Sequence, residues 1–193
     1  MRLGIFGGSF DPPHIGHLLV AEDACDQLGL DRLIFVPAAV QPLKLGRDAA
    51  AAAHRLEMVR LLAEGDPRFE VSAAEVERAG LSFTVDTLTH FASEFPAAER
   101  YFLVGADVLG TFAQWREPGR VLELATMVVL ERADAKPATL PPALEPAALR
   151  RLGTRRVDVS STEVRERVRQ GRPIRGFVTD SVAAYIARHG LYR

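Results

Sequence analysis

The N-terminal segment constrains the fold most, because a glycine turn stands directly between an apolar strand and a helix. Residues 3–6 (LGIF) have the character of a buried strand, and residues 7–17 (GGSFDPPHIGH) follow at once. The two prolines suit the start of a helix, where a missing N–H costs little. His14 and His17 are three residues apart and therefore share one helical face, and Gly16 lets a ligand approach the backbone. Free backbone N–H groups and imidazoles at a helix start predict a site for a phosphate.

Two common glycine motifs are excluded here. No Lys-Ser/Thr pair follows the glycines, as a P-loop requires, and the spacing is not the G-x-G-x-x-G of dinucleotide folds. His14 and His17 could instead be surface residues of a capped helix, or ligands of a zinc ion. Zinc usually takes three or four protein ligands, and the single cysteine, Cys25, lies further along the same helix.

Along the rest of the chain, short runs of β-branched and aromatic residues alternate with helical patterns. This alternation predicts an α/β fold: a Rossmann-like, doubly wound parallel sheet with helices on both faces, followed by a C-terminal helical segment. Ligands are then expected at the carboxyl ends of the strands, where the glycine turn lies. The expected strands are residues 2–6, 32–36, 69–71, 100–104, 126–131 and 156–159, and the expected helices are residues 14–28, 49–64, 85–95, 161–170 and 181–189.

Composition narrows the class of protein. A chain of 193 residues without internal repeats predicts one domain spanning residues 1–193. A net charge of −1 provides no general attraction to nucleic acid or membranes, and no apolar run approaches the roughly 20 residues that span a bilayer. One cysteine and no signal peptide favour a cytoplasmic protein. The sequence is compatible with a homo-oligomer but does not decide the oligomeric state, and the proline-rich stretch 133–147 has no readable chemistry.

A second candidate site lies near the C-terminus, in residues 159–165 (VSSTEVR). Ser160 with Glu163 three residues later has the pattern of a capping box, which by itself would explain a capped, solvated helix. The hydroxyls and free N–H groups at this helix start, with Arg165 one turn further on, also suit a triphosphate. The pattern therefore predicts a second anion site.

These two motifs together resemble those of the bacterial nicotinate-mononucleotide adenylyltransferases, members of the nucleotidyltransferase superfamily with an (H/T)-x-G-H motif. Residues 159–165 are similar to the family's I-S-S-T-x-I-R, and residues 81–88 (LSFTVDTL) to its S-x-Y-T-x-D-T-L. Residues 102–107 (FLVGAD), Trp115 and the ending of the chain also match. The resemblance implies transfer of the adenylyl group of ATP to nicotinate mononucleotide, giving nicotinate adenine dinucleotide and pyrophosphate in NAD biosynthesis, with Mg²⁺ accompanying ATP.

The resemblance also implies residue roles. His14 and His17 would bind the transferring and bridging phosphate oxygens, and Arg165 would hold the β- and γ-phosphates together with Ser160 and Ser161. The two histidines and Arg165 form the implied catalytic set. No residue is assigned as a metal ligand. The implied ATP-binding set is Gly7, Gly8, Ser9, Phe10, Gly16, Gly105, Asp107, Ser160, Ser161 and Thr162, and the implied acceptor-binding set is Lys44, Phe83, Thr84, Asp107 and Trp115.

Departures from the family pattern leave alternatives open. The family's P-P-H-K appears as residues 41–44 (QPLK), so Lys44 could be a solvated lysine, and Phe83 replaces a tyrosine. Asp107 could be a helix N-cap, and Trp115 could be a packing residue. Alternative functions are a nicotinamide-mononucleotide or phosphopantetheine adenylyltransferase and a non-catalytic nucleotide sensor.

Overall fold

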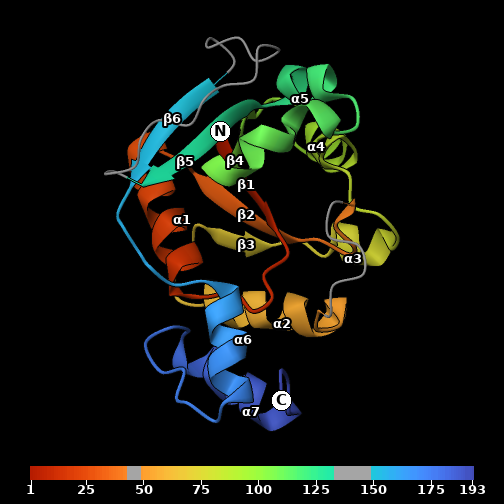
Figure 1. The fold of residues 1–193 in the computed structure, drawn as a ribbon. Coiled ribbons are helices and arrows are strands. Elements are labelled where there is room, and N and C mark those ends of the chain that lie inside the picture. Colours follow the sequence, from red (N-terminus) through yellow and green to blue (C-terminus); the bar gives the residue numbers. More distant parts are fainter. Residues whose placement is uncertain (43–48, 133–148) are drawn as a thin grey trace.

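A six-stranded parallel sheet forms the centre of the molecule (Figure 1). The computed structural model describes residues 1–42, 49–132 and 149–193. The strand order is β3-β2-β1-β4-β5-β6, and every neighbouring pair is parallel. The order reverses direction between β1 and β4, which marks the crevice where doubly wound sheets bind ligands. The strands are β1 (Arg2–Gly8), β2 (Arg32–Pro37), β3 (Phe69–Val71), β4 (Glu99–Gly105), β5 (Thr126–Arg132) and β6 (Leu149–Thr154).

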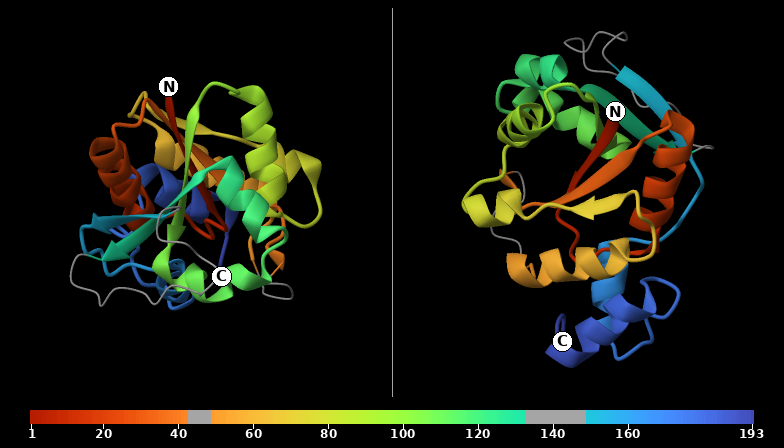
Figure 2. Two further views of the ribbon diagram at one scale, coloured as in Figure 1. Left: turned by 90° about the horizontal axis from the view of Figure 1, so that it is seen from above. Right: turned by 180° about the vertical axis from the view of Figure 1, so that it is seen from behind.

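Helices cover both faces of the sheet, as predicted (Figure 2). One face packs against α1 (Ile15–Leu28) and α2 (Ala52–Ala63), joined by the C-terminal helices α6 (Ser161–Arg169) and α7 (Asp180–His189). The other face packs against α4 (Thr84–Glu94), the 3₁₀ helix η2 (Ala106–Gln114) and α5 (Pro118–Leu124). The short helix α3 (Ala74–Arg78) lies between β3 and α4.

The alternation of side chains along the strands explains this arrangement. In β4, Tyr101 and Leu103 belong to the core cluster under α1 and α2, whereas Phe102 and Val104 belong to the cluster under α4 and α5. Successive residues of a strand point to opposite faces, so a strand covered on both sides must be apolar throughout. The uniformly apolar run in β4 is therefore the sequence mark of a central strand.

One predicted strand is wrong. Residues 156–159 are not in the sheet, and the sixth strand is β6, at residues 149–154. Asp23 of α1, only 7% exposed, accepts hydrogen bonds from the backbone N–H and the guanidinium of Arg155. Because this contact binds the chain to α1 directly after β6, residues 156–159 leave the sheet. The sequence does not predict α3 and α5, which are too short for a clear periodicity, or η2, whose 3₁₀ geometry has three residues per turn and not the α-helical period.

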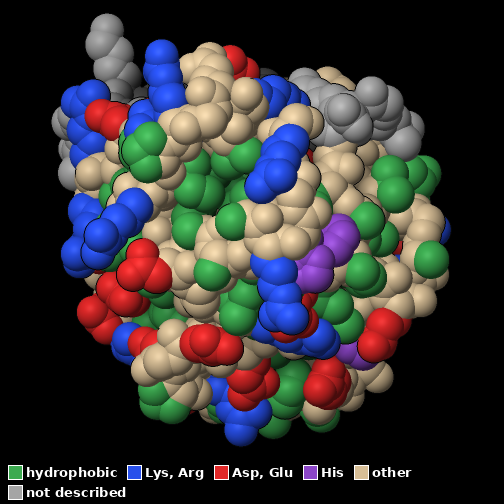
Figure 3. Space-filling view, turned by 90° about the horizontal axis from the view of Figure 1, so that it is seen from below, with side chains coloured by type: hydrophobic (Ala, Val, Ile, Leu, Met, Phe, Trp, Pro, Cys, Tyr) green, Lys and Arg blue, Asp and Glu red, His purple; other side chains and the backbone are tan. Residues whose placement is uncertain are grey.

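The C-terminal helices close the carboxyl end of the sheet. Val164 of α6 and Val182 and Ile186 of α7 are buried in the same cluster as α1 and α2. Seen from this end, acidic and basic side chains are interspersed and histidines reach the surface among them (Figure 3). Within the described ranges, no helix combines the length and apolar character needed to cross a membrane.

Candidate active site

A pocket of about 770 Å³ opens at the carboxyl ends of β1, β2 and β4. Its walls come from segments far apart in the sequence: residues 6–11 and 14–20, residues 38–41, residues 49–55 and residues 155–165. Gly105, at the end of β4, also contributes. The pocket therefore lies where the parallel sheet predicted a ligand, and it joins the two motifs found in the sequence.

Gly7 and Gly8, expected to form a turn, are the last residues of β1, and the chain turns after them. Residues 7–14, called the glycine turn below, are shaped by the side chain of Phe10. This residue has a positive φ of 48° and is buried against the rings of Phe6 and Phe35, with ring centroids 5.6 and 5.9 Å away. A Cβ added at Gly8 would lie 2.9 Å from the Phe10 ring. Gly8 is thus required by a close approach, because any side chain there would displace the ring that supports the turn.

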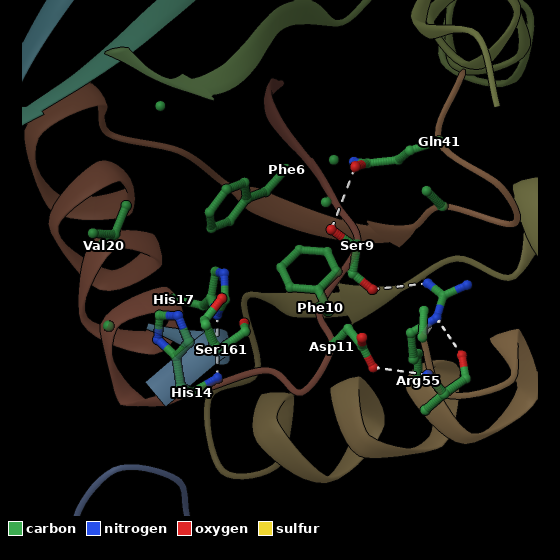
Figure 4. Close-up of a pocket in the computed structure, with 18 of the residues that line it drawn as sticks. Phe6, Ser9, Phe10, Asp11, His14, His17, Val20, Gln41, Arg55 and Ser161 are labelled. Atoms are coloured by element: carbon green, nitrogen blue, oxygen red, sulfur yellow. Dashed lines mark hydrogen bonds between the residues drawn. The ribbon is translucent and has the colours of Figure 1, made fainter. Parts of the chain in front are cut away.

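The two histidine rings pack against each other beside this turn, with their planes tilted by 31° (Figure 4). Their ring centroids are 3.8 Å apart, and the backbone N–H of His14 donates to Nδ1 of His17 at 3.1 Å. Since Nδ1 of His17 accepts, the neutral His17 ring carries its proton on Nε2. Burial lowers the pKa of His14 to about 4, so its imidazole is neutral at pH 7. A Cβ at Gly16 would lie 3.0 Å from Nδ1 of His14, so this glycine also makes room for the imidazole.

The start of α6 is held directly against the glycine turn. Ser160 caps the helix by accepting from the backbone N–H of Glu163 at 3.1 Å, which confirms this half of the predicted capping box. The Ser161 hydroxyl donates to the carbonyl of Pro12 at 2.8 Å, and Nη1 of Arg165 donates to the carbonyl of Asp11 at 2.6 Å. Motifs separated by about 150 residues thereby form one wall.

Two polar atoms in this wall lack hydrogen-bond partners. Across the described part of the chain, the buried side-chain nitrogens and oxygens without a partner are Nδ1 of His14 and Nε of Arg165. A buried polar group left unpaired costs about 1–3 kcal/mol. An anion that accepts from these groups would remove that cost, so the wall is suited to phosphate oxygens.

The charged groups lining the pocket are mostly cationic. Arg55, Arg155 and Arg165 line it, and Asp11 is the carboxylate among the described lining residues. Asp11 accepts from the backbone N–H of Ala50 at 3.1 Å and from the Tyr192 hydroxyl at 2.7 Å. Burial, together with the neighbouring Asp11 carboxylate, raises the pKa of Tyr192, so this hydroxyl stays a donor. The positive balance favours a polyanionic ligand.

Three of the predicted acceptor-binding residues, Phe83, Thr84 and Trp115, lie outside this pocket. Phe83 precedes the first residue of α4, Thr84, and neither lines the cavity. Trp115 follows η2, with its ring 5.3 Å from Phe112 and its Nε1 3.4 Å from the Thr111 hydroxyl. In this structure Trp115 packs on the core cluster beneath α4 and α5, as its alternative interpretation holds.

The remaining predictions concern Lys44, Asp107 and a zinc site that includes Cys25. Lys44 and the side chain of Asp107 lie outside the described residues. The N-cap of η2 is Gly105, so the interpretation of Asp107 as an N-cap is wrong. Cys25 is buried in the core and does not line the pocket, so it is not brought to the histidines as a zinc site would require. Within the described ranges, no group of three or more His, Cys, Asp or Glu side chains could hold a metal ion.

Asp11 and Arg55 are buried charged residues of the pocket wall that sequence reasoning missed, and the clearer case is Arg55. It is only 5% exposed and donates hydrogen bonds to three backbone carbonyls. A signal was present: Arg55 falls on the same helical face as the apolar Met58, Val59 and Leu62. A single arginine on a buried face is rare and calls for buried acceptors.

Comparison with known proteins agrees with this geometry. Residues 5–167 match the family described as cytidylyltransferase-like. The chain is 52% identical to a probable nicotinate-nucleotide adenylyltransferase of Gemmatimonas aurantiaca, covering 100% of this chain and 93% of the relative. It is 44% identical, over the full length of both chains, to a protein of the same name from Thermus thermophilus. The fold is similar to that of Plasmodium falciparum nicotinic acid mononucleotide adenylyltransferase complexed with NaAD, with a TM-score of 0.77 at 17% identity, covering 99% of this chain and 97% of that one.

Proposed function

The chain belongs to the cytidylyltransferase-like family, and we propose that it transfers the adenylyl group of ATP to nicotinate mononucleotide. The products are nicotinate adenine dinucleotide, an intermediate of NAD biosynthesis, and pyrophosphate. The observation that carries the proposal is the wall shared by the two motifs, where Nδ1 of His14 and Nε of Arg165 are buried without a partner. These groups meet at the carboxyl end of β1, where a triphosphate would find neutral and cationic donors together.

The half of the proposed site that binds ATP, here called the donor half, consists of residues 7–17 and 160–165. It acts by positioning the phosphates and by neutralising their charge. The phosphate of the mononucleotide attacks the α-phosphorus of ATP in line, and pyrophosphate leaves. Nε2–H of His17 donates to an oxygen of the transferring phosphate, and His14, neutral because of its burial, donates beside it. Arg165, with the hydroxyl of Thr162, binds the leaving phosphates, and Ser161 holds this wall against the glycine turn through its bond to Pro12. Such donors lower the barrier as charge develops on these oxygens.

A divalent metal ion accompanies ATP in nucleotidyl transfer, and we propose Mg²⁺ in this role, where it neutralises charge on the phosphates. The donor set of the pocket fits an ion held mainly by ATP and water. Asp11 lines the pocket, but its carboxylate already accepts from Ala50 and Tyr192. Magnesium keeps several waters and needs few protein ligands.

The acceptor half is proposed at the start of α4 and the end of η2. The backbone N–H groups at Thr84 begin a helix, and a helix start favours a carboxylate. Trp115 lies beyond η2 and provides a flat apolar surface for a pyridine ring. Lys44 and Asp107 belong to the same proposal. A nicotinate acid group, rather than its amide, suits these donors because the amide NH₂ would face them without an acceptor.

The test is pyrophosphate release with ATP and each of three acceptors. Nicotinate mononucleotide is expected to be preferred over nicotinamide mononucleotide by roughly tenfold to a hundredfold in kcat/KM, since each unpaired group costs about 1–3 kcal/mol. Phosphopantetheine is expected to be inactive. An amide equal to or better than the acid would contradict the acceptor assignment, and ATP binding without turnover of any acceptor would favour a nucleotide sensor.

A single nucleotidyltransferase domain over residues 1–193 forms part of this proposal. It is supported by the two core clusters, which share one sheet. The cytoplasm is the proposed compartment, since the chain's single thiol, Cys25, is free and buried.

A further inference from the structure

Ala39, two residues after β2, is bound through both of its backbone polar groups. Its carbonyl accepts from Nη2 of Arg55 at 2.8 Å, and its N–H donates to the Ser82 hydroxyl at 2.9 Å. The neighbouring Ala38 donates its N–H to the carbonyl of Gly8 at 2.9 Å. The segment after β2 therefore lies between the glycine turn and the approach to α4, and contacts both.

On the side of the glycine turn, the contacts come from Arg55 (Figure 4). Besides Ala39, its guanidinium donates to the carbonyl of Ser9 at 2.8 Å and to the carbonyl of Ala50 at 3.0 Å. The guanidinium is planar and rigid, so its donors hold their acceptors in a fixed arrangement. One side chain thus sets the relative positions of the glycine turn, the segment after β2 and the approach to α2.

On the side of α4, the contacts end in the carboxyl group of Glu75. The Ser82 hydroxyl, which accepts from Ala39, donates to Glu75, and the Thr87 hydroxyl of α4 donates to the same carboxyl group. Ser82 also donates its backbone N–H to the carbonyl of Val40 at 2.9 Å. The pKa of Glu75 is raised, because the effect of burial exceeds the lowering by the two hydroxyl donors. Glu75 is 7% exposed, so these hydroxyls take the place of water.

We propose that Arg55 and Glu75 are positioning residues for adenylyl transfer. Acting through Ala39, they hold the start of α4, where the acceptor binds, at a set distance from the glycine turn, where ATP binds. In-line transfer needs the reacting atoms to be about 3–3.5 Å apart and aligned, so a small shift of one half against the other lowers the rate steeply. This inference rests on the proposed function of the same site.

The first experiment compares Arg55→Ala with Arg100→Ala. Arg100 is a matched control, because its guanidinium also donates to three carbonyls, those of Leu124, Phe95 and Ala98, at the opposite end of the sheet. Both variants are expected to lower Tm. Only Arg55→Ala is expected to lower kcat/KM of the folded protein for nicotinate mononucleotide, by about 100-fold. Arg55→Lys keeps the charge but loses the planar fork, so it is expected to behave like Arg55→Ala.

The second experiment tests the Glu75 side without disturbing Arg55. Thr87→Val removes a donor to Glu75, whereas Thr89→Val, on the same helix, removes a hydroxyl that donates to the carbonyl of Val85 at 2.8 Å. Thr87→Val is expected to raise KM for nicotinate mononucleotide about tenfold and to leave KM for ATP unchanged. Thr89→Val is expected to change neither. The comparison of Thr87→Val with Thr89→Val still tests the positioning role if Arg55→Ala does not fold.

The outcomes separate this inference from the proposed function. A wild-type protein that does not use nicotinate mononucleotide would contradict the function. The positioning role is overturned if the wild type is active and Arg55→Ala retains the same kcat/KM as Arg100→Ala. Recovery by Arg55→Lys would assign the effect to charge near the phosphates, and equal changes of both KM values in Thr87→Val would assign it to general destabilisation; either result also overturns the positioning role.

Discussion

The donor half and the acceptor half of the proposed site are built in different ways. The donor half, at residues 7–17 and 160–165, lines the pocket and keeps buried nitrogens of His14 and Arg165 without partners. The proposed acceptor half is different: Trp115 packs on Phe112 and Phe102, and the ring of Phe83 lies under the guanidinium of Arg116 at 5.0 Å.

The difference follows from the chemistry of the two ligands. A phosphate is bound by polar groups at helix starts, and two buried groups of this kind in the described part of the chain, Nδ1 of His14 and Nε of Arg165, find no partner within the protein. A pyridine ring is bound by flat apolar side chains, which can pack against the protein's own core when no ligand is present. The comparison predicts large catalytic effects in the donor half and smaller, substrate-specific effects in the acceptor half.

The largest effect is expected from His17→Ala. Losing a donor to the transferring phosphate should lower kcat by roughly 10²–10³, with the fold retained. Steady-state pyrophosphate release and circular dichroism measure the two quantities. His90→Ala is the control, because His90 pairs with Glu94 at 3.3 Å on the surface of α4. Wild-type turnover in His17→Ala would contradict a role of the donor half in the reaction.

The next effect concerns the pH dependence of stability set by His14. Its pKa falls from 6.5 to about 4 through burial, so the folded state prefers the neutral ring. The resulting stability is present above about pH 6.5 and is lost as the pH falls toward 4, by up to about 3 kcal/mol. Urea unfolding at pH 7 and pH 4.5 should therefore show a smaller acid loss in His14→Ala than in the wild type. Trp115→Ala removes no titratable group and should keep the wild-type dependence.

Arg165→Ala should separate the two substrates. Because Arg165 lies one turn into α6 and lines the pocket, its loss should raise KM for ATP about 30-fold, with far less change for nicotinate mononucleotide. Arg169→Ala, one turn further along α6 at an exposed position, should change neither KM. Equal effects of Arg165→Ala on both substrates would indicate that it acts only by holding the carbonyl of Asp11.

The smallest effect is expected in the acceptor half. Trp115→Ala should weaken binding of nicotinate mononucleotide about tenfold and leave ATP binding nearly intact, as measured by isothermal titration calorimetry. Phe95→Ala is the control, since Phe95 packs against the same core cluster but lies at the far end of α4. If the two variants lose stability alike and neither changes binding, Trp115 is a packing residue and the comparison between the halves fails there.

Local pattern determined much of the fold. The strands near residues 2, 32, 69, 100 and 126 were predictable, because each is a short run rich in apolar residues whose neighbours along the chain are turns or helical patterns. The N-terminal part of the donor half was predictable for the same reason: a strand, a glycine turn and a helix start are consecutive in residues 3–17, so their proximity follows from covalent connection. Residues 160–165 reach this segment only through contacts between distant residues.

The rest depended on contacts between distant residues, which no local pattern contains. The end of the sheet lies at β6 rather than at residues 156–159 because Asp23 of α1 binds Arg155, 132 positions away. Arg55 belongs to the pocket only because Ser9, Ala39 and Ala50 present carbonyls to one buried guanidinium. The sequence by itself therefore determined five of the six strands and each of the two phosphate motifs, because the residues within each of them are neighbours along the chain. The tertiary structure decided which buried polar groups find partners, because burial removes water and leaves only groups folded in from elsewhere to replace it.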